Sequence, residues 1–186
     1  MSLRDVAVLI GSLRKESLTR KTALALAQLA PASLKLDIVE IGQLPLYNAD
    51  LETATPPAEW TAFRDRIRPA DAVLFATPEY NRSVPGALKN AIDVGSRPPG
   101  KSVFDRKPAA IISVSPGAIG GFGANHHLRQ SLVFLNMPEM QMPEAYVGGA
   151  GKLFDENGKL TVDSTREFLT KYMADFAAWI ERNAWQ

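Results

Sequence analysis

Short apolar runs alternate with amphipathic segments along most of this chain. Four runs have the length of a strand and end where Gly, Pro or polar residues begin: 6–10, 34–41, 72–77 and 109–115. Between them, apolar residues recur at spacings of three and four, as on one face of a helix, over 19–30, 57–67, 85–95 and 125–135. This alternation predicts a parallel sheet with helices on both faces.

The last part of the chain extends the same pattern. A shorter fifth strand is expected within 143–149, and a closing helix within 164–185, with Ser164 as its N-cap and Glu167 completing a capping box. Two stretches rich in Pro, Gly and polar residues, 41–57 and 95–108, are predicted to be loops because the alternation resumes directly after each. The sequence thus predicts a doubly wound α/β domain of five strands and five helices, spanning residues 1–186 as a single unit.

Composition narrows the possible chemistry. The chain has no Cys, which excludes disulfides, thiolate nucleophiles and Cys-based zinc sites, so any redox chemistry requires a cofactor. Its formal charge of +1 gives no global reason to bind nucleic acid or anionic lipid. No apolar stretch approaches the roughly 20 residues of a membrane span. We expect the first residues to form a strand rather than a signal peptide, and the protein to be cytoplasmic.

Open α/β sheets bind ligands beyond the carboxyl ends of their strands. Three loops leave such ends: 11–17, 78–83 and 115–123. The functional site is therefore expected in these three loops.

The first loop carries hydroxyl groups and positive charge before a helix begins. It has neither the further glycines of GxGxxG nor the GK[ST] of a nucleoside-triphosphate loop. It does offer Ser12, Ser17 and Thr19, the guanidinium of Arg14, and the free amides of a helix start, which together suit a phosphate monoester. An alternative is that Ser17 or Thr19 only caps the helix and the basic residues form a solvated face. A reciprocal capping box is absent, because Arg20 stands three residues after Ser17.

The second loop follows the third predicted strand. Pro78 ends the strand, and Ser83 followed by Pro85 marks the start of the next helix. Glu79, Tyr80 and Asn81 lie between them, where backbone amides and an aromatic side chain could hold a planar heterocycle.

Three stretches together resemble a known family. "GSLRKES" (11–17), "PEYNRSVPGALKNAID" (78–93) and "SPGAIGG" (115–121) are similar to the signatures of flavodoxin-like NAD(P)H-dependent FMN reductases, which include quinone, azo-dye and chromate reductases. The resemblance covers nearly the whole chain in the same order. It implies a flavodoxin-like fold, non-covalent FMN, NAD(P)H as electron donor, and quinone, azo, flavin or metal-oxyanion acceptors.

The resemblance also implies roles for particular residues. In this family the first loop holds the FMN phosphate, which assigns that role to Ser12, Arg14, Ser17 and Thr19, although relatives often have Asn in place of Thr19. The second loop wraps the flavin ring, mostly through its main chain, and the third closes the other side of the ring. The implied contacts in these two loops are Pro78, Glu79, Tyr80, Asn81, Ser115, Gly117, Gly120 and Gly121.

The sequence gives little support for a metal site or a serine hydrolase site. His126 and His127 point to different sides of a helix and have no carboxylate cluster or Cys beside them, so we assign them a structural or interface role and predict no metal site. The GxSxG elbow of serine hydrolases is absent. Because hydride chemistry would take place on the flavin, no catalytic side chain is predicted.

Two alternatives to the reductase remain open. The chain could be an FMN-binding electron carrier that a protein partner reduces, or it could use free FMN as a diffusible substrate. The resemblance further implies a homodimer or homotetramer, with the helices after the second and third loops as contacts.

Overall fold

The computed structural model describes residues 2–184 and contains one parallel five-stranded sheet. Its strands are β1 (Arg4–Ile10), β2 (Leu34–Val39), β3 (Ala72–Thr77), β4 (Ala109–Val114) and β5 (Ala145–Val147). Their order is β2-β1-β3-β4-β5, the order of a flavodoxin-like sheet. The predicted doubly wound α/β fold is confirmed.

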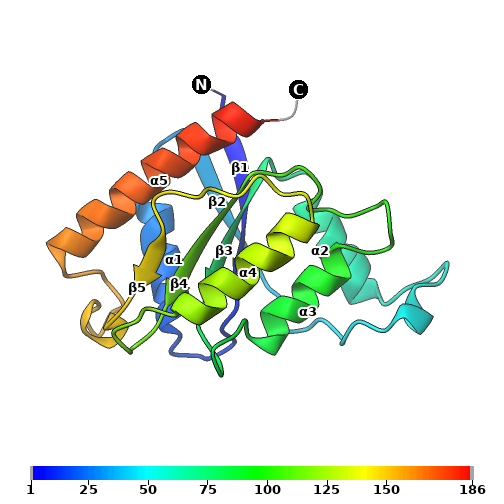
Figure 1. Cartoon of the computed structure of the whole chain (residues 1–186), viewed down its shortest axis with the longest axis horizontal. Helices are drawn as coiled ribbons and strands as arrows, with labels where there is room; N and C mark the ends of the chain where they lie inside the picture. The colour runs from blue at the N-terminus through cyan, green and yellow to red at the C-terminus, as the bar shows by residue number, and fades with distance from the viewer. Residues whose placement is uncertain (1, 185–186) are drawn as a thin grey trace.

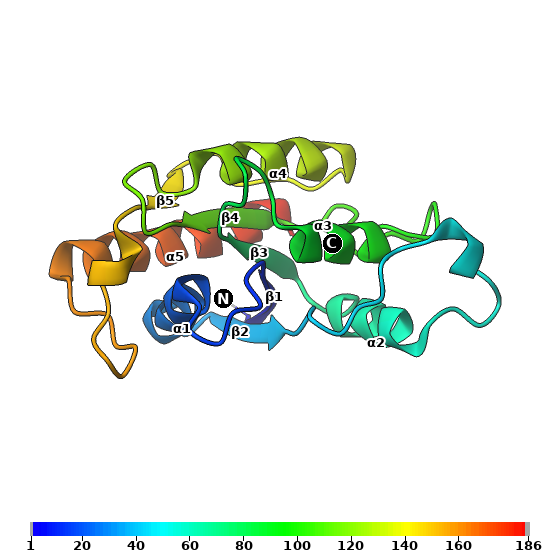
Figure 2. The same ribbon diagram turned by 90° about the horizontal axis from the view of Figure 1, so that it is seen from below.

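Five α-helices connect or follow the strands: α1 (Leu18–Leu29), α2 (Ala58–Ile67), α3 (Gly86–Gly95), α4 (Phe122–Phe134) and α5 (Asp163–Asn183). Two short 3-10 helices, η1 (Ala49–Leu51) and η2 (Ala150–Lys152), lie in loops. Figure 2 shows α1 and α5 on one side of the sheet and α2, α3 and α4 on the other, as predicted.

The sheet separates two apolar layers because side chains alternate along each strand. Val6, Val8 and Ile10 face α1 and α5, where Tyr172 and Phe176 are fully buried. On the opposite face, Ala7 and Leu9 pack with residues of α2, α3 and α4. Strands buried on both faces explain why the sequence shows continuous apolar runs rather than alternation.

Several predicted boundaries need correction. The second and fourth strands end one or two residues early, at Val39 and Val114, and the fourth helix begins at Phe122, three residues before its apolar periodicity starts. The capping box at Ser164 is wrong, because the N-cap of α5 is Val162, with no side-chain capping bond, and Ser164 lies within the helix. The last residue of the predicted closing helix, Trp185, lies outside the described residues.

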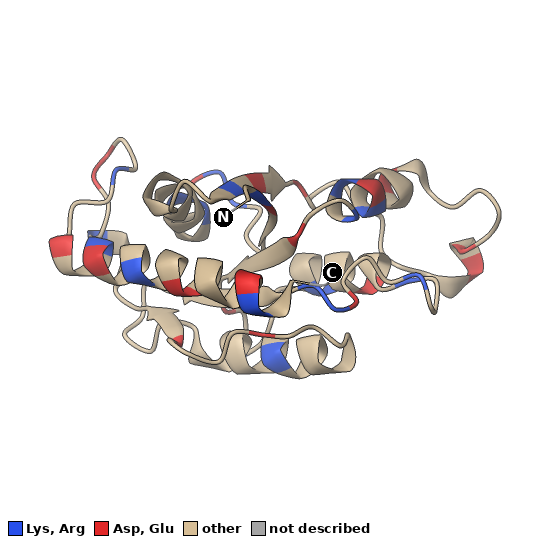
Figure 3. Cartoon of the chain, turned by 90° about the horizontal axis from the view of Figure 1, so that it is seen from above, with Lys and Arg blue, Asp and Glu red and all other residues tan. Residues whose placement is uncertain are grey.

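The surface of the described chain carries both signs of charge interspersed. Figure 3 shows acidic and basic residues mixed along α5 and α2. Many of them form ion pairs, such as Lys171 with Asp175 and Arg66 with Asp37. Within 2–184, every helix is too short or too polar to serve as a bilayer span.

Candidate functional site

The loops after β1, β3 and β4 gather at one edge of the sheet, the lower edge in Figure 1. They leave the carboxyl ends of three neighbouring parallel strands, next to the point where the chain winds first to β2 and then back to β3. The first two loops also touch, since a Cβ placed on Gly11 would lie 3.2 Å from Cδ of Pro78. The predicted site residues therefore lie along a continuous edge.

The first loop keeps its hydroxyl groups close to the protein. Ser12, Ser17 and Thr19 are all buried, whereas Arg14 is exposed. Within residues 2–184, the hydroxyls of Ser12 and Thr19 make no hydrogen bond and Arg14 makes no ion pair. The two hydroxyl oxygens reach the surface, since every fully buried side-chain N or O atom in this part of the chain has a partner. These three groups remain available to a ligand, and α1 has no acidic residue in its first turn to compete with an anion.

Ser17 does act as the N-cap of α1. Its Oγ accepts a hydrogen bond from the backbone N of Arg20 at 3.0 Å. The capping alternative is thus correct for this side chain, although a hydroxyl that accepts one bond still has a proton to donate. The basic side chains near the start of α1 are only partly free in solvent. Arg20 forms an ion pair with Glu40 at 2.7 Å, and Lys21 forms one with Glu16 at 3.3 Å.

The second loop forms a tight turn. Tyr80 and Ser83 exchange backbone hydrogen bonds of 3.1 and 3.0 Å, and Asn81 and Arg82 have φ angles of 51° and 63°. Two positive φ angles in a two-residue turn are typical of type I′, which Asn tolerates and Arg disfavours. The turn presents Tyr80 and Asn81 to solvent above the end of β3.

The third loop rests on β4 and β5. Ser115 Oγ accepts from the backbone N of Gly117 at 3.1 Å, and Gly117 is exposed at the top of the loop. Gly120 and Gly121 are buried at its base with φ angles of 66° and 79°. A Cβ on Gly120 would lie 2.7 Å from the carbonyl carbon of Tyr146, so glycine is required for both conformation and space.

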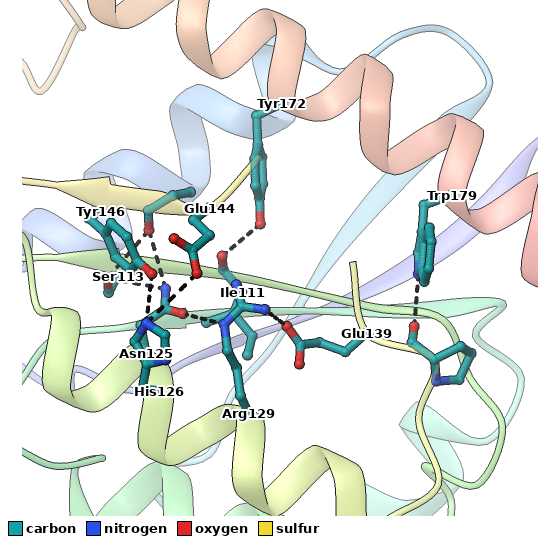
Figure 4. A network of polar contacts seen from close by, with 12 residues as sticks. Ile111, Ser113, Asn125, His126, Arg129, Glu139, Glu144, Tyr146, Tyr172 and Trp179 are labelled. Carbon is teal, nitrogen blue, oxygen red and sulfur yellow. Dashed lines mark hydrogen bonds and ion pairs between the residues drawn. The ribbon is translucent and has the colours of Figure 1, made fainter. Parts of the chain in front are cut away.

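A polar network holds α4, which follows the third loop, against β4 and β5 (Figure 4). Asn125 Nδ2 donates to Ser113 Oγ and to the carbonyl of Ala145, each at 3.3 Å, and all three are buried. Arg129 donates to Asn125 Oδ1 at 3.0 Å and forms an ion pair with Glu139. This network fixes the start of α4 relative to the sheet.

The two histidines contact neighbouring side chains. His126 Nε2 lies 2.8 Å from the hydroxyl of Tyr146, and its ring packs on Phe122 with a centroid distance of 4.2 Å. Burial, followed by the nearby Glu144, raises the pKa of Tyr146 to about 12, so this phenol keeps its proton at neutral pH. His127 Nδ1 lies 3.0 Å from Ser83 Oγ. In the described part of the chain, no group of three or more metal-ligating side chains occurs.

Sequence reasoning missed the side chain of Glu79. The resemblance implies a cofactor contact for this residue through its main chain, whereas the Oε2 of its side chain accepts from the backbone N of Ala124 at the start of α4, at 3.0 Å. The glycines at 120, 121 and 123 are the signal in the sequence that could have indicated this contact. A helix whose N-cap is a glycine has no local side chain to accept a hydrogen bond from its first-turn amides, so an acceptor has to come from another segment.

Comparisons with known proteins identify the family. The profile of the family described as NADPH-dependent FMN reductase matches residues 4–152. The chain is 67% identical over 179 residues to a quinone reductase of Pseudomonas putida, covering 96% of both proteins. It is 45% identical over 175 residues to a 2-hydroxy-1,4-benzoquinone reductase of a Burkholderia species, covering 94% of this chain and 95% of that protein.

A solved structure shares the fold throughout. FerB, a flavoenzyme NAD(P)H:(acceptor) oxidoreductase from Paracoccus denitrificans, superposes with a TM-score of 0.92 at 42% identity, covering 98% of this chain and 100% of that one. The expected family, oxidoreductase class and flavin cofactor are confirmed. The chain belongs to the NADPH-dependent FMN reductase family.

Proposed function

We propose that this chain holds FMN with its phosphate in the loop 11–17 and its flavin ring between the loops after β3 and β4, and that it reduces quinones with electrons from NAD(P)H. The observation that carries the proposal is the set of unsatisfied donors in front of α1. Within 2–184 the hydroxyls of Ser12 and Thr19 make no hydrogen bond and Arg14 makes no ion pair. Because every fully buried side-chain N or O atom there has a partner, both hydroxyls reach the surface, where a ligand can meet them. Hydroxyls, a guanidinium and a helix start fit a phosphate monoester without a metal ion.

The ring would lie between the second and third loops. Pro78, Glu79, Tyr80 and Asn81 offer backbone groups on one side, and Ser115, Gly117, Gly120 and Gly121 form the other side. Gly117 is exposed and has no side chain, so the flavin ring could come close to its backbone. Gly120 and Gly121 are buried, and their positive φ angles give the loop its conformation.

Bound FMN would supply the redox chemistry, with hydride arriving from NAD(P)H and electrons leaving to the acceptor. The side chains of this chain then have to bind and orient; none is required to transfer a proton or form a covalent bond. Catalytic rate would depend on the position of the ring, which the three loops determine.

Quinones are the acceptors that we propose first, ahead of azo compounds, free flavins and metal oxyanions. Leu13, Tyr80, Ile119 and Phe122 remain exposed, one or two in each loop region. An apolar rim suits a flat, uncharged acceptor better than an oxyanion. The relatives from Pseudomonas putida and the Burkholderia species carry quinone in their names.

An anaerobic titration tests the reductase. We expect NADPH or NADH alone to bleach the protein-bound flavin, and a panel of quinone, azo, flavin and metal-oxyanion acceptors to restore its colour, fastest with quinones. Absence of bleaching by either nucleotide would favour the FMN-binding electron carrier. Loss of yellow colour on gel filtration would favour free FMN as a diffusible substrate.

We also propose that the chain is a single domain that forms a homodimer or homotetramer through α3 and α4. Val133 and Phe134, near the end of α4, are 74% and 81% exposed, which a second copy would cover. We place the protein in the cytoplasm because its proposed donor, NAD(P)H, is available there. A partner protein, a nucleic acid or a membrane is not part of this proposal.

A further inference from the structure

The carboxylate of Glu79 points away from the solvent and toward α4. Its Oε2 lies 3.0 Å from the backbone N of Ala124, and only 14% of the side chain is exposed. Ala124 is the third residue of α4, whose first-turn amides have no partner within the helix. The N-cap, Gly121, has no side chain to supply an acceptor. Glu79 therefore caps α4 from another loop, and its negative charge is favourable at that end of the helix.

The turn 80–83 also lies directly on the first turn of α4. A Cβ on Gly123 would lie 2.7 Å from the carbonyl oxygen of Arg82 and 2.9 Å from Oε2 of Glu79. One helical turn later, His127 contacts Ser83 at 3.0 Å. Glycine at 123 is what allows the turn and the helix to come this close.

The turn needs such support, because its own conformation is unfavourable. Arg82 has a positive φ of 63°, which is disfavoured for a side chain of this kind. Arg82 Nη1 lies 3.5 Å from Oε1 of Glu79, so the same carboxylate contacts both the strained residue and the helix. Without it, we expect the turn to sample other conformations.

The helix is a firm anchor for the turn. Asn125, next to Ala124, is fully buried; it donates to Ser113 Oγ (Figure 4) and to the carbonyl oxygen of Ala145. Arg129 connects Asn125 to Glu139 on the segment before β5. A turn tied to α4 is thereby tied to β4 and β5, under the third loop.

We propose that the Glu79 carboxylate is a positioning residue for FMN, which joins the second and third loops into one preformed wall for the flavin ring. The inference rests on the proposed function, which places the ring between these loops. The side chain of Glu79 acts through Ala124 and leaves the main chain of 79–81 free for the ring. When only a fraction of the apoprotein has the binding conformation, the apparent affinity falls by that fraction.

Binding of FMN to the apoprotein, measured by quenching of flavin fluorescence, tests the proposal. We expect Glu79→Ala to weaken FMN binding by about ten-fold, if roughly one apoprotein molecule in ten keeps the turn in place. Glu79→Gln keeps an acceptor oxygen for Ala124, and we expect it to remain within about three-fold of the wild type. Glu156→Ala, the same truncation in the exposed turn 155–158, is the matched control and should bind FMN as the wild type does.

Amide hydrogen exchange of the apoprotein gives a readout that does not involve FMN. We expect the amide of Ala124 to exchange faster in Glu79→Ala than in the wild type and to be restored by Glu79→Gln. If the wild-type protein failed to bind FMN while this exchange pattern held, the proposed function would be wrong, but the contact between Glu79 and Ala124 would be confirmed. If the wild type bound FMN and Glu79→Ala bound it equally well, the positioning role would be overturned.

A second variant covers the case in which Glu79→Ala does not fold. Gly123→Ala leaves Glu79 unchanged, but its added Cβ would push the turn and the Glu79 carboxylate away from α4. We expect this variant to weaken FMN binding as well. Unchanged affinity in this variant would contradict the proposal. A third outcome is an equal loss of FMN affinity in Glu79→Ala and Glu79→Gln, with slow amide exchange at Ala124 in both. It would show that the charge of Glu79 acts on the flavin directly, and it would overturn the proposed positioning role through Ala124.

Discussion

Arg14 is the side chain whose removal most directly tests the phosphate-binding loop. It is exposed and has no ion pair within 2–184, so Arg14→Ala breaks nothing in the apoprotein. A guanidinium that contacts a phosphate contributes a charge-assisted hydrogen bond. We expect the variant to lose about 2 kcal/mol of FMN binding free energy, roughly 30-fold in affinity, by apoprotein titration. The neighbouring Lys15→Ala serves as the control, and equal affinity in both variants would contradict the assignment.

Lys107 allows a prediction about pH dependence. Its Nζ donates to the carbonyl oxygens of Arg68 and Ala70 beyond the end of α2, and burial lowers the pKa of this ammonium from 10.5. As the pH rises from the lowered folded pKa toward 10.5, the folded state releases the proton before the unfolded state does. The unfolded state then binds more protons, so the contribution of Lys107 to stability increases with pH over this range.

The measurement is urea unfolding of wild type and Lys107→Met at several alkaline pH values below 10.5. We expect the difference in unfolding free energy, wild type minus variant, to increase with pH. A difference that stays constant or decreases over that range would show that the folded-state pKa is not lowered.

Single residues differ in how much of their role the sequence could predict. Ser17 and Thr19 were found because hydroxyls directly before a helix form a local pattern, and both lie at the start of α1. The side chain of Glu79 was not found, because its partner, the amide of Ala124, is 45 positions away in the chain. A contact of that kind depends on how the helices are placed on the sheet.

At the scale of elements, α5 begins without a side-chain cap. Its N-cap is Val162, in an extended conformation with φ −96°, and no side chain accepts from the first-turn amides there. Ser and Thr at this position stabilise helices relative to Val by about 1 kcal/mol. We expect Val162→Ser to raise the melting temperature by roughly 2–4 °C.

Ser164→Ala is the companion to that variant. Because Ser164 lies inside α5 and is exposed, we expect its melting temperature to stay close to that of the wild type. Were Ser164 the cap, as the capping box predicted, the variant would instead lose about 1 kcal/mol. Thermal unfolding of both variants by circular dichroism distinguishes the two positions of the helix start.

Whole elements were predicted better than their ends. All five strands and five helices are present because each has a continuous apolar run or a helical period that local sequence reveals. The start of α4 at Phe122 was missed, since the left-handed Gly121 and the acceptor Glu79 replace the usual capping residue. A helix start built from a distant loop leaves no local capping signal.

At the scale of the whole molecule, the exposed end of α4 predicts an interface between copies. Phe134 is 81% exposed beside Val133, and the groove between α3 and α4 continues the same surface past Ile92 and His127. We expect the wild type to elute as a dimer or tetramer, and Phe134→Glu to shift the assembly to smaller species, because a buried unpaired charge is strongly unfavourable at an interface.

Light scattering coupled to size exclusion measures the mass of each species directly. Leu3→Glu is the matched control, since it places the same charge on an exposed apolar residue that precedes β1 and belongs to neither α3 nor α4, and it should leave the assembly unchanged. A monomeric wild type, or an assembly that Phe134→Glu leaves intact, would rule out this face. If Phe134→Glu dissociates the assembly and the monomer still retains FMN, the cofactor site is complete within one chain, as the arrangement of the three loops at one sheet edge predicts.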